Sequence, residues 1–308
     1  MEGYVAVTDH GWYEKLAYEP GSRDVNFWRP STRAFRLVPG TPFFFKLKAP
    51  YNAVVGFGYF VSFTVLPDWL AWETFGEGNG VANLEALRGR LGAIQKGARI
   101  AADPAGRIGC CLLAEARFFG VNQWVKAPTD WKPRTQTGAG YDLSKGEGLR
   151  VWQECIERAR AMAPNLLEAA EPSSDEPRYG EPTLHRPRLG QGIFRIQVLD
   201  AYDRACAVTG EHSLPVLEAA HIKPYSRGGI HEVPNGITLR SDVHRLFDRG
   251  YVTVDDNRLI VGKRLRDDFA NGRSYYSLHG KPIQLPGDPT SWPAAAAIQW
   301  HREHVFLG

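Results

Sequence analysis

The sequence predicts an α+β protein built from two domains. Its 308 residues exceed the usual size of one domain, which is about 100–200 residues. Segments with the composition of strands are interspersed with segments of helical periodicity. Between the two halves, residues 164–187 contain five prolines together with serine and acidic residues, a composition typical of a linker. We therefore predict domains over residues 1–163 and 188–308, joined by a linker over residues 164–187.

The first domain is predicted to contain more strands than helices. Four stretches rich in aromatic and β-branched residues indicate strands: residues 4–8, 41–48, 53–66 and 108–113. Apolar residues at helical spacing indicate two helices, over residues 83–95 and 148–162. Seven of the nine tryptophans lie in this half, so aromatic side chains are concentrated in the first domain.

The second domain is predicted to have the order helix, strand, loop, strand, helix. Its first elements are a helix, a short strand with a turn, a strand, a loop and a strand: residues 193–205, 206–210, 216–222, 225–230 and 236–239. A short helix follows. Ser241 can cap its start, because a serine hydroxyl accepts a hydrogen bond from a free backbone N–H. Gly250 suits its end, because glycine adopts the C-terminal cap conformation.

Composition and charge restrict the class of protein. Hydrophobic residues make up 43% and charged residues 23% of the chain, which excludes a disordered, collagen-like or coiled-coil protein. No run reaches the roughly 18 apolar residues of a membrane span, and residues 1–10 do not resemble a signal peptide. We expect a cytoplasmic protein with no membrane partner. The net charge of +3 allows nucleic acid as a partner. The four cysteines form no CxxC pair, so we expect no structural zinc and no disulfide framework.

Three residues of the second domain form a candidate catalytic constellation. His221 ends a predicted strand, Asn235 directly precedes the next strand, and His244 lies on the following helix. Phosphodiester hydrolysis needs a neutral imidazole that takes a proton from the attacking water. It also needs a divalent cation that absorbs charge on the phosphate. A side-chain amide can hold the loop between the strands. Asp248 lies one helical turn after His244, so both side chains can face the same ion.

The run CAVTG…LEAAHIKPYSRGG…PNGITLRSDVHRLFDRG, within residues 188–254, resembles the HNH nucleases of the ββα-metal class. The resemblance implies that His221 is the general base. It also implies that Asn235 orients the loop and that His244 is a metal ligand, with Asp248 as a second ligand. The remaining histidines are expected to be bystanders: His231, His279, His301 and His304.

One position departs from the HNH pattern. Many HNH sites have an acidic residue or a histidine directly before the base, whereas this chain has Ala220. The metal would then have fewer protein ligands and more water, which suits Mg²⁺ or Mn²⁺. Glu218 lies two residues earlier on the same strand face, as a candidate for an indirect contribution, but we assign it no role.

Aromatic segments of the first domain, within residues 4–160, resemble the PUA-like superfamily. These segments are VNFWRPS, FFFKLKAP, VVGFGYF, LAWETFGEGNG and WVKAPTDW. Within the superfamily they are similar to the EVE-type readers that are fused to HNH nucleases, with SRA-type readers as close relatives. The resemblance implies a small β-barrel with a concave pocket that accepts a base flipped out of a DNA duplex.

A flipped base needs aromatic faces for stacking and a few hydrogen bonds to its pairing edge. Candidate pocket residues are aromatic or polar side chains of the first domain: Trp28, Phe27, Asn26, Arg29, Ser31, Trp12, Tyr13 and Trp69. For every aromatic among them, the alternative is a place in the hydrophobic core.

These expectations describe a modification-dependent restriction endonuclease. The first domain would recognise 5-methylcytosine or 5-hydroxymethylcytosine in double-stranded DNA by base flipping, and the HNH domain would hydrolyse the phosphodiester bond. Each HNH unit cuts one strand, so we expect a homodimer. Two alternatives remain open. One is an HNH nuclease whose first domain binds RNA or unmodified DNA, and the other is a catalytically inactive nucleic-acid binding module.

Overall fold

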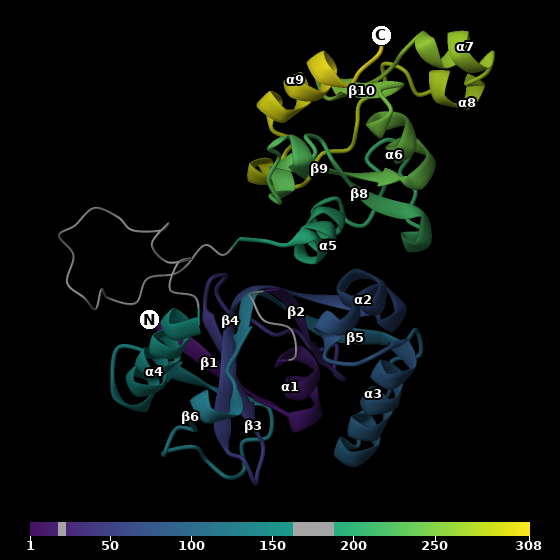
Figure 1. The fold of residues 1–308 in the computed structure, drawn as a ribbon. Coiled ribbons are helices and arrows are strands. Elements are labelled where there is room, and N and C mark those ends of the chain that lie inside the picture. Colours follow the sequence, from purple (N-terminus) through teal and green to yellow (C-terminus); the bar gives the residue numbers. More distant parts are fainter. Residues whose placement is uncertain (18–22, 163–187) are drawn as a thin grey trace, which may run out of the picture. The chain divides into compact units, whose positions relative to one another are not determined.

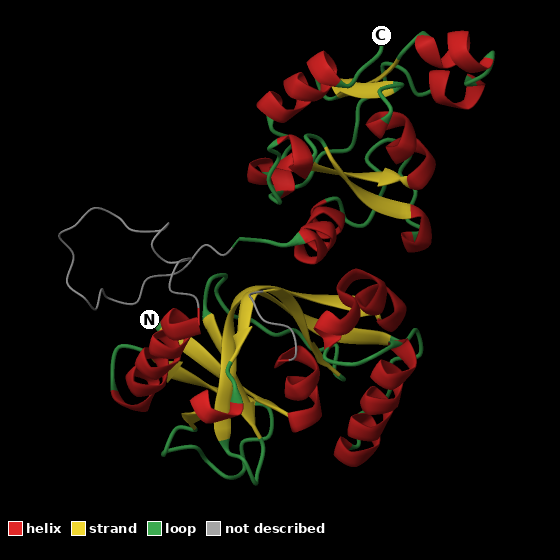
Figure 2. Cartoon of the chain, in the orientation of Figure 1, coloured by secondary structure: helices red, strands yellow, loops and turns green. Residues whose placement is uncertain are grey.

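The computed structural model of the chain describes residues 1–17, 23–162 and 188–308. The chain divides into two compact units, Met1–Arg188 and Leu189–Gly308 (Figure 1). The predicted linker over residues 164–187 lies outside the described residues. Helices and strands are mixed in both units, so the predicted α+β class is confirmed (Figure 2).

The first unit contains, in its described part, one seven-stranded sheet. Its strands are β1 (Glu2–Thr8), β2 (Arg23–Arg29), β3 (Pro42–Leu47), β4 (Ala53–Pro67), β5 (Arg107–Phe118), β6 (Val125–Lys126) and β7 (Gly138–Asp142). The order is β2-β5-β4-β3-β1-β7, with β6 beside β4. Strands β1 and β3 are parallel, and the other pairs are antiparallel. Among the described strands, β2 and β7 end this path and do not pair with each other.

Helices cover both faces of this sheet. They are α1 (His10–Ala17), α2 (Asp68–Phe75), α3 (Leu84–Ala98) and α4 (Gly146–Met162), with the short 3₁₀ helices η1 (Gly76–Asn79) and η2 (Val121–Gln123). Phe43 and Phe45 of β3 pack with residues of α1, whereas Phe44 packs with residues of α4. Successive strand residues point to opposite faces. The two helices therefore cover opposite faces, which explains why every residue of β3 is buried.

The predicted strands of this unit correspond to β1, β3, β4 and β5, and the predicted helices to α3 and α4. Five helices and strands of the described part of this unit were not predicted: α1, β2, α2, β6 and β7. Strand β2 has the sequence RDVNFWR, whose polar residues break the alternation of apolar side chains. Its extended conformation is stabilised by antiparallel pairing with β5, a partner far away in the sequence.

The second unit is built around two short antiparallel hairpins. Its elements are α5 (Gln191–Ala201), β8 (Leu217–His221), β9 (Gly236–Arg240), α6 (Ser241–Asp248), β10 (Val252–Asp255), β11 (Arg258–Val261), α7 (Arg264–Phe269), α8 (Arg273–Tyr276) and α9 (Ala295–His304). Strand β8 pairs with β9, and β10 pairs with β11. The predicted order of strand, loop, strand and helix is confirmed by β8, β9 and α6.

Two local predictions in the second unit were wrong. Residues 206–210 form a turn and no strand, because Gly210 N–H donates to the carbonyl of Cys206 at 2.9 Å. Ser241 does not cap α6: it is the first residue of the helix, Arg240 holds the cap position, and no side chain caps it. The prediction for Gly250 holds, since this residue follows the helix with φ of 76°.

The C-terminal helix α9 supports the second unit. His301 of α9 is buried, and its Nδ1 lies 2.9 Å from Thr253 Oγ1 on β10. Its Nε2 lies 3.0 Å from the carbonyl oxygen of Phe247 on α6, and the two rings stack at 3.7 Å. Helix α9 is thereby attached to both α6 and β10. His301 was expected to be a bystander, but it is a structural residue of this core.

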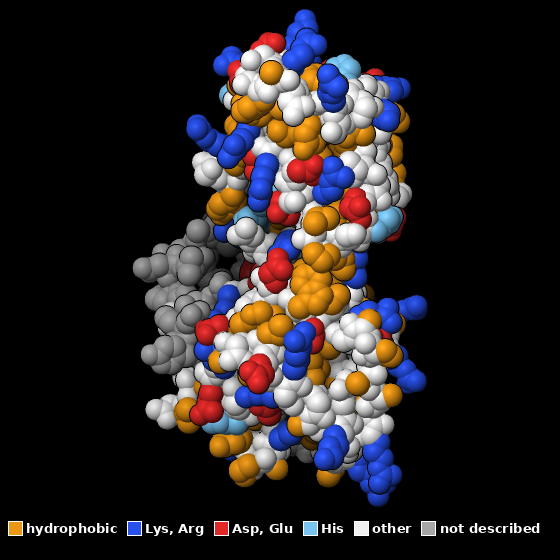
Figure 3. Space-filling view, turned by 90° about the vertical axis from the view of Figure 1, so that its right-hand side faces the viewer, with side chains coloured by type: hydrophobic (Ala, Val, Ile, Leu, Met, Phe, Trp, Pro, Cys, Tyr) orange, Lys and Arg blue, Asp and Glu red, His pale blue; other side chains and the backbone are white. Residues whose placement is uncertain are grey.

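Acidic and basic side chains are interspersed on the face of the molecule that Figure 3 shows. Lysine and arginine number 37 against 34 acidic residues in the whole chain. Recognition of a charged partner must therefore rest on local geometry more than on net charge. No helix in the described part of the chain is both long and apolar enough to cross a membrane.

Candidate active site

The loop between β8 and β9 is held by the side chain of Asn235. This residue is buried and directly precedes β9. Its Oδ1 accepts a hydrogen bond from Lys223 N at 2.9 Å, and its Nδ2 donates to the carbonyls of Lys223 and Ile230, both at 2.9 Å. One amide thus connects the start and the end of the loop. This is the geometry that a loop-holding asparagine requires.

His221 lies at the end of β8, opposite Gly236 of β9. Its ring stacks on Phe194 of α5 with centroids 4.0 Å apart. A Cβ at Gly236 would lie 2.9 Å from the Phe194 ring and would clash with Val198. Glycine is therefore needed here for α5 to approach the strand pair closely. The sequence alone gave no role to Gly236.

The ring of His221 is neutral near pH 7. Burial lowers its pKa to about 4, and the nearby His231 and His244 add to this effect while Asp248 opposes it. Desolvation disfavours the charged imidazolium. A neutral imidazole is the protonation state that a general base needs before it takes a proton.

His244 lies between two carboxylates. Its Nδ1 is 2.6 Å from Oε2 of Glu218 on β8, and its Nε2 is 3.3 Å from Oδ2 of Asp248 on α6. Burial lowers the pKa of His244, but the hydrogen bonds and charges of Asp248 and Glu218 outweigh burial, so the pKa is raised overall. The sequence left Glu218 without a role, although its place on the same strand face as Ala220 was a usable signal.

His244 and Asp248 have the donor chemistry of a divalent metal site. An imidazole nitrogen and a carboxylate oxygen lie together on one face of α6. Glu218 on the other nitrogen is the carboxylate partner that commonly orients a metal-binding histidine. Among the described residues, no group of three or more His, Cys, Asp or Glu side chains has the arrangement of a metal site. A cation held by these two ligands would complete its coordination with water and phosphate oxygens.

The sequence of this unit matches a known family. Residues 206–255 match the family model described as HNH endonuclease, and this range includes β8, β9 and α6. The chain therefore contains an HNH endonuclease domain, and the prediction that it is a nuclease is confirmed. Nucleases of this kind act on DNA and generally use a divalent metal. Comparison with curated proteins gave no match.

Two solved structures are similar to the chain at low sequence identity. The ASCH protein from Zymomonas mobilis is 11% identical with a TM-score of 0.34, and the match covers 49% of this chain and 94% of that chain. The modification dependent TagI restriction endonuclease is 12% identical with a TM-score of 0.30, and the match covers 99% of this chain and 81% of that chain.

Four of the predicted base-pocket residues lie in the core of the first unit. Trp12, Tyr13 and Trp28 are only 3%, 4% and 8% exposed. The Tyr13 hydroxyl donates to the carbonyl of Phe119 at 2.6 Å, and Trp28 Nε1 donates to the carbonyl of Asn79 at 2.7 Å. Asn26 is fully buried and donates to the Asn79 side chain at 2.9 Å. The Tyr13 hydroxyl, the Trp28 indole and the Asn26 amide nitrogen are therefore engaged within the unit, whereas Asn26 Oδ1 is buried without a hydrogen-bond partner among the described residues.

The other four predicted pocket residues are partly exposed: Phe27, Arg29, Ser31 and Trp69. Phe27 and Arg29 lie on β2, Ser31 follows this strand, and Trp69 lies on α2. The guanidinium of Arg29 lies over the ring of Phe35 at 5.1 Å. Its Nη1 is buried and has no hydrogen-bond partner within residues 1–17, 23–162 and 188–308. Arg29 thus has an unpaired donor that is buried within the first unit.

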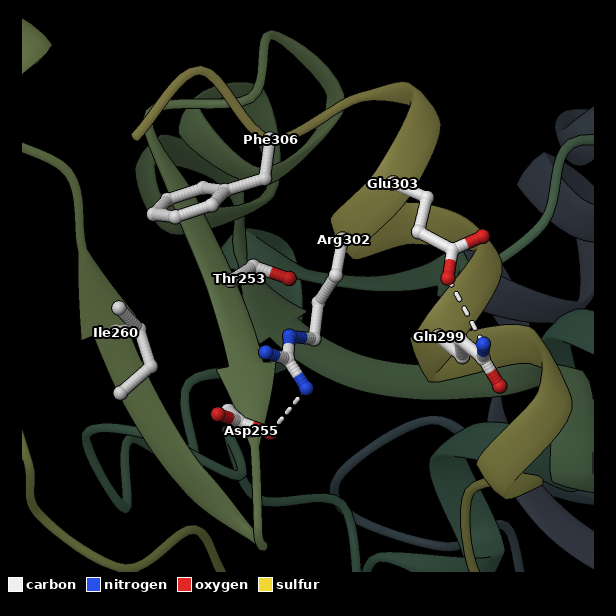
Figure 4. Close-up of a pocket in the computed structure, with 7 residues that line it drawn as sticks. All are labelled: Thr253, Asp255, Ile260, Gln299, Arg302, Glu303 and Phe306. Carbon is white, nitrogen blue, oxygen red and sulfur yellow. Dashed lines mark hydrogen bonds and ion pairs between the residues drawn. The ribbon is translucent and has the colours of Figure 1, made fainter.

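Two hollows lie away from these candidate residues. One, of about 620 Å³, lies in the first unit between α1, η1 and α3, and its lining includes Lys15, Glu77 and Arg90. None of the eight predicted pocket residues lines it. The other, of about 400 Å³, lies between the β10–β11 hairpin and α9 and includes the ion pair of Arg302 with Asp255 (Figure 4). It does not include His221 or His244, so it is separate from the nuclease site.

Proposed function

We propose that the chain is a modification-dependent DNA endonuclease. Its first unit would recognise 5-methylcytosine or 5-hydroxymethylcytosine, and His221 would be the general base of its HNH domain. The observation that carries the nuclease half is the position of His221, whose ring is neutral near pH 7, at the start of the loop that Asn235 holds. This geometry matches the residue types and roles that the HNH resemblance implies.

The residues of this site suit hydrolysis of a phosphodiester bond. His221 takes a proton from water as the water oxygen bonds to phosphorus and the bond to the leaving oxygen breaks. Asn235 keeps the loop in the conformation that positions the ring of His221. His244 and Asp248 would hold a divalent cation, which when bound stabilises the negative charge on the phosphate. Glu218 orients the ring of His244 through its Nδ1.

The proposed reader function rests on the first unit. Removing a base from the duplex stack costs a few kcal/mol, which stacking on aromatic side chains can offset. Phe27 is partly exposed, and its ring contacts those of Trp12, Phe43 and Phe45. Arg29 beside it on β2 has a buried donor without a partner among the described residues. An arginine donor can bond to the oxygen or nitrogen of a pyrimidine edge. We propose these two residues as the centre of base recognition.

We further propose an oligomeric state and a cellular location for the protein. One HNH site cuts one strand, so a double-strand break by a single complex needs two copies, and we propose a homodimer. Sedimentation of the protein with and without a modified duplex would measure the number of copies. Incoming foreign DNA is the substrate that such an enzyme would restrict, and we propose that it acts in the cytoplasm.

A cleavage assay tests both halves of the proposal. The substrates are matched duplexes that carry cytosine, 5-methylcytosine or 5-hydroxymethylcytosine, incubated with Mg²⁺ or Mn²⁺. We expect cutting of a modified duplex only. We also expect a loss of about 10²–10⁴-fold in rate for His221→Ala, the usual contribution of a general base.

The other outcomes discriminate between the rivals. Equal cutting of all three duplexes would keep the nuclease and remove the modified-base reader. Preferred binding of RNA, or of unmodified duplex, by the His221→Ala variant would favour the alternative in which the first unit reads those ligands. Undiminished cutting by His221→Ala would remove His221 as the general base.

A further inference from the structure

His231 contacts the proposed general base. Its Nδ1 lies 3.1 Å from Nε2 of His221, with the two ring planes 68° apart. His231 was expected to be a bystander. The β8–β9 loop folds back and places the two imidazoles edge to edge.

Neighbouring groups hold both rings in this arrangement. Phe194 stacks on His221, and Tyr225 stacks on His231 with centroids 4.6 Å apart and planes inclined by 13°. The carbonyl of Ile230, directly before His231, accepts a hydrogen bond from Asn235 Nδ2 at 2.9 Å. The same asparagine that holds the loop therefore also positions the backbone of His231.

The contact between two neutral rings allows two proton arrangements. Burial lowers the pKa of His221 and of His231, so near pH 7 one nitrogen of the contact carries the proton and the other accepts it. If His231 donates, the only lone pair of His221 is occupied by the hydrogen bond. If His221 donates from Nε2, its Nδ1 keeps a free lone pair. Within the described residues, Nδ1 of His221 forms no hydrogen bond.

We propose that His231 is a positioning residue that accepts the Nε2–H of His221 and so directs the Nδ1 lone pair to the attacking water. This inference rests on the proposed role of His221 as the general base. The water proton moves to Nδ1 while the oxygen–phosphorus bond forms and the bond to the leaving oxygen breaks. The Nε2 proton stays on His221, and its hydrogen bond to His231 strengthens when the ring becomes positively charged. The hydrogen bond of the second nitrogen commonly selects the tautomer of a histidine in this way.

Two substitutions of His231 distinguish its hydrogen bond with His221 from its stacking on Tyr225. His231→Asn can place its Oδ1 near the position of Nδ1 and keep an acceptor. His231→Phe keeps a ring that stacks on Tyr225 but removes the acceptor. We expect kcat on a cleavable duplex to fall by about 10–100-fold in the phenylalanine variant, part of the contribution of a general base. We expect the asparagine variant to stay within about threefold of wild type, and KM for DNA to be unchanged in both.

Nitrogen-15 NMR of the histidine side chains gives a readout that is independent of activity and of metal. In metal-free wild-type protein and in His231→Asn, we expect His221 as the Nε2–H tautomer. In His231→Phe, we expect a mixture of tautomers. The pH profile of kcat is measured for the same three proteins. Both variants remove the contribution of His231 to the lowered pKa of His221, whereas His244 and Asp248 are unchanged.

The outcomes distinguish this inference from the proposed function. Full cutting by His221→Ala would overturn the role of His221 and with it this inference. Loss of cutting in His221→Ala together with wild-type kcat in His231→Phe would overturn only the inference. An Nδ1–H tautomer of His221 in the wild type would also overturn it, and this measurement decides the question even if the phenylalanine variant does not fold.

Discussion

The side chain of Asn235 makes three hydrogen bonds to backbone groups of the β8–β9 loop. Each such bond contributes about 0.5–1.5 kcal/mol, and a buried group left without a partner costs about 1–3 kcal/mol. Both the position of His221 and that of His231 depend on this loop. At the scale of single residues, the one side chain of Asn235 therefore stabilises the loop and fixes the positions of both His221 and His231.

Asn235→Ala is expected to lower the free energy of unfolding by about 2–4 kcal/mol, because three hydrogen bonds are lost in a buried site. Urea denaturation of both proteins measures this difference. Asn271→Ala is the matched control, since Asn271 is exposed and its replacement should change stability by less than about 0.5 kcal/mol. Equal stability of the two variants would contradict the role of the amide.

Glu218→Ala is expected to weaken metal binding without removing a proposed ligand. The carboxylate lies 2.6 Å from Nδ1 of His244. Loss of such a partner typically costs 10–100-fold in metal affinity, roughly the range expected here. Titration of the cleavage rate with Mn²⁺ gives the half-saturating concentration. Glu218→Gln keeps an oxygen acceptor and should show a smaller shift. Identical titration curves for the wild type, Glu218→Ala and Glu218→Gln would show that Glu218 does not contribute to metal binding.

At the scale of elements, the short helix α6 carries His244, Asp248 and Phe247. Its end is defined by Gly250, which has φ of 76° and donates to the carbonyl of Phe247 at 3.0 Å. The carbonyl of Gly250 accepts a hydrogen bond from Leu307 N at 2.9 Å. The end of α6 is thus joined to the C-terminal tail, and the position of the proposed metal ligands depends on this junction.

Gly250→Ala is expected to destabilise the second unit by more than the usual cost of a strained dihedral. A Cβ here would clash with the carbonyl oxygen of Val305. Gly280→Ala is the matched control, because Gly280 also has a positive φ of 73° but has open space at its Cβ. We expect a loss of about 1 kcal/mol for the control and about 2–4 kcal/mol for Gly250→Ala. Calorimetric melting of both variants measures the two losses of stability. A larger loss in Gly280→Ala than in Gly250→Ala would refute the prediction.

At the scale of the whole molecule, stability depends on two histidines that the fold favours in the neutral form: His301, which is buried, and His221, which is partly buried. Burial lowers the pKa of His301, and it lowers that of His221 to about 4, whereas both groups titrate near 6.5 in an unfolded chain. Below pH 6.5 the unfolded chain therefore binds protons that the folded chain does not bind. Above pH 6.5 both states are neutral, and the stability contribution is fully present.

Acidification from pH 6.5 toward pH 4 is expected to lower the free energy of unfolding. Each of these histidines contributes a slope of at most about 1.4 kcal/mol per pH unit. His301→Gln should reduce the slope, because the amide can still donate to the carbonyl of Phe247 but does not titrate in this range. Hydrogen exchange of the α9 amides between pH 7 and 5 measures the change. A slope that is unchanged in the variant would exclude His301 as a source.

Local patterns were sufficient for the α+β class and for the core of the HNH domain. Strand β3 contains three consecutive phenylalanines and β4 is a long apolar run, whereas β8, β9 and α6 follow one another closely in the chain. Strand β2 and helix α1 were missed, because the first has a polar sequence and the second is only eight residues long. Their conformations are stabilised by distant partners, which a local pattern does not contain.

Contacts between distant residues were decided only by the tertiary structure. Glu218 meets His244 across 26 positions, and the loop brings His231 to His221 although no spacing rule links them. Trp28 is aromatic and lies in a polar segment, but its indole donates to a backbone carbonyl 51 residues away in the core. Residue type and spacing indicate which chemical roles a side chain can have. Which partner it meets depends on how the chain packs, because packing alone sets burial, tautomer and the atoms within hydrogen-bonding distance.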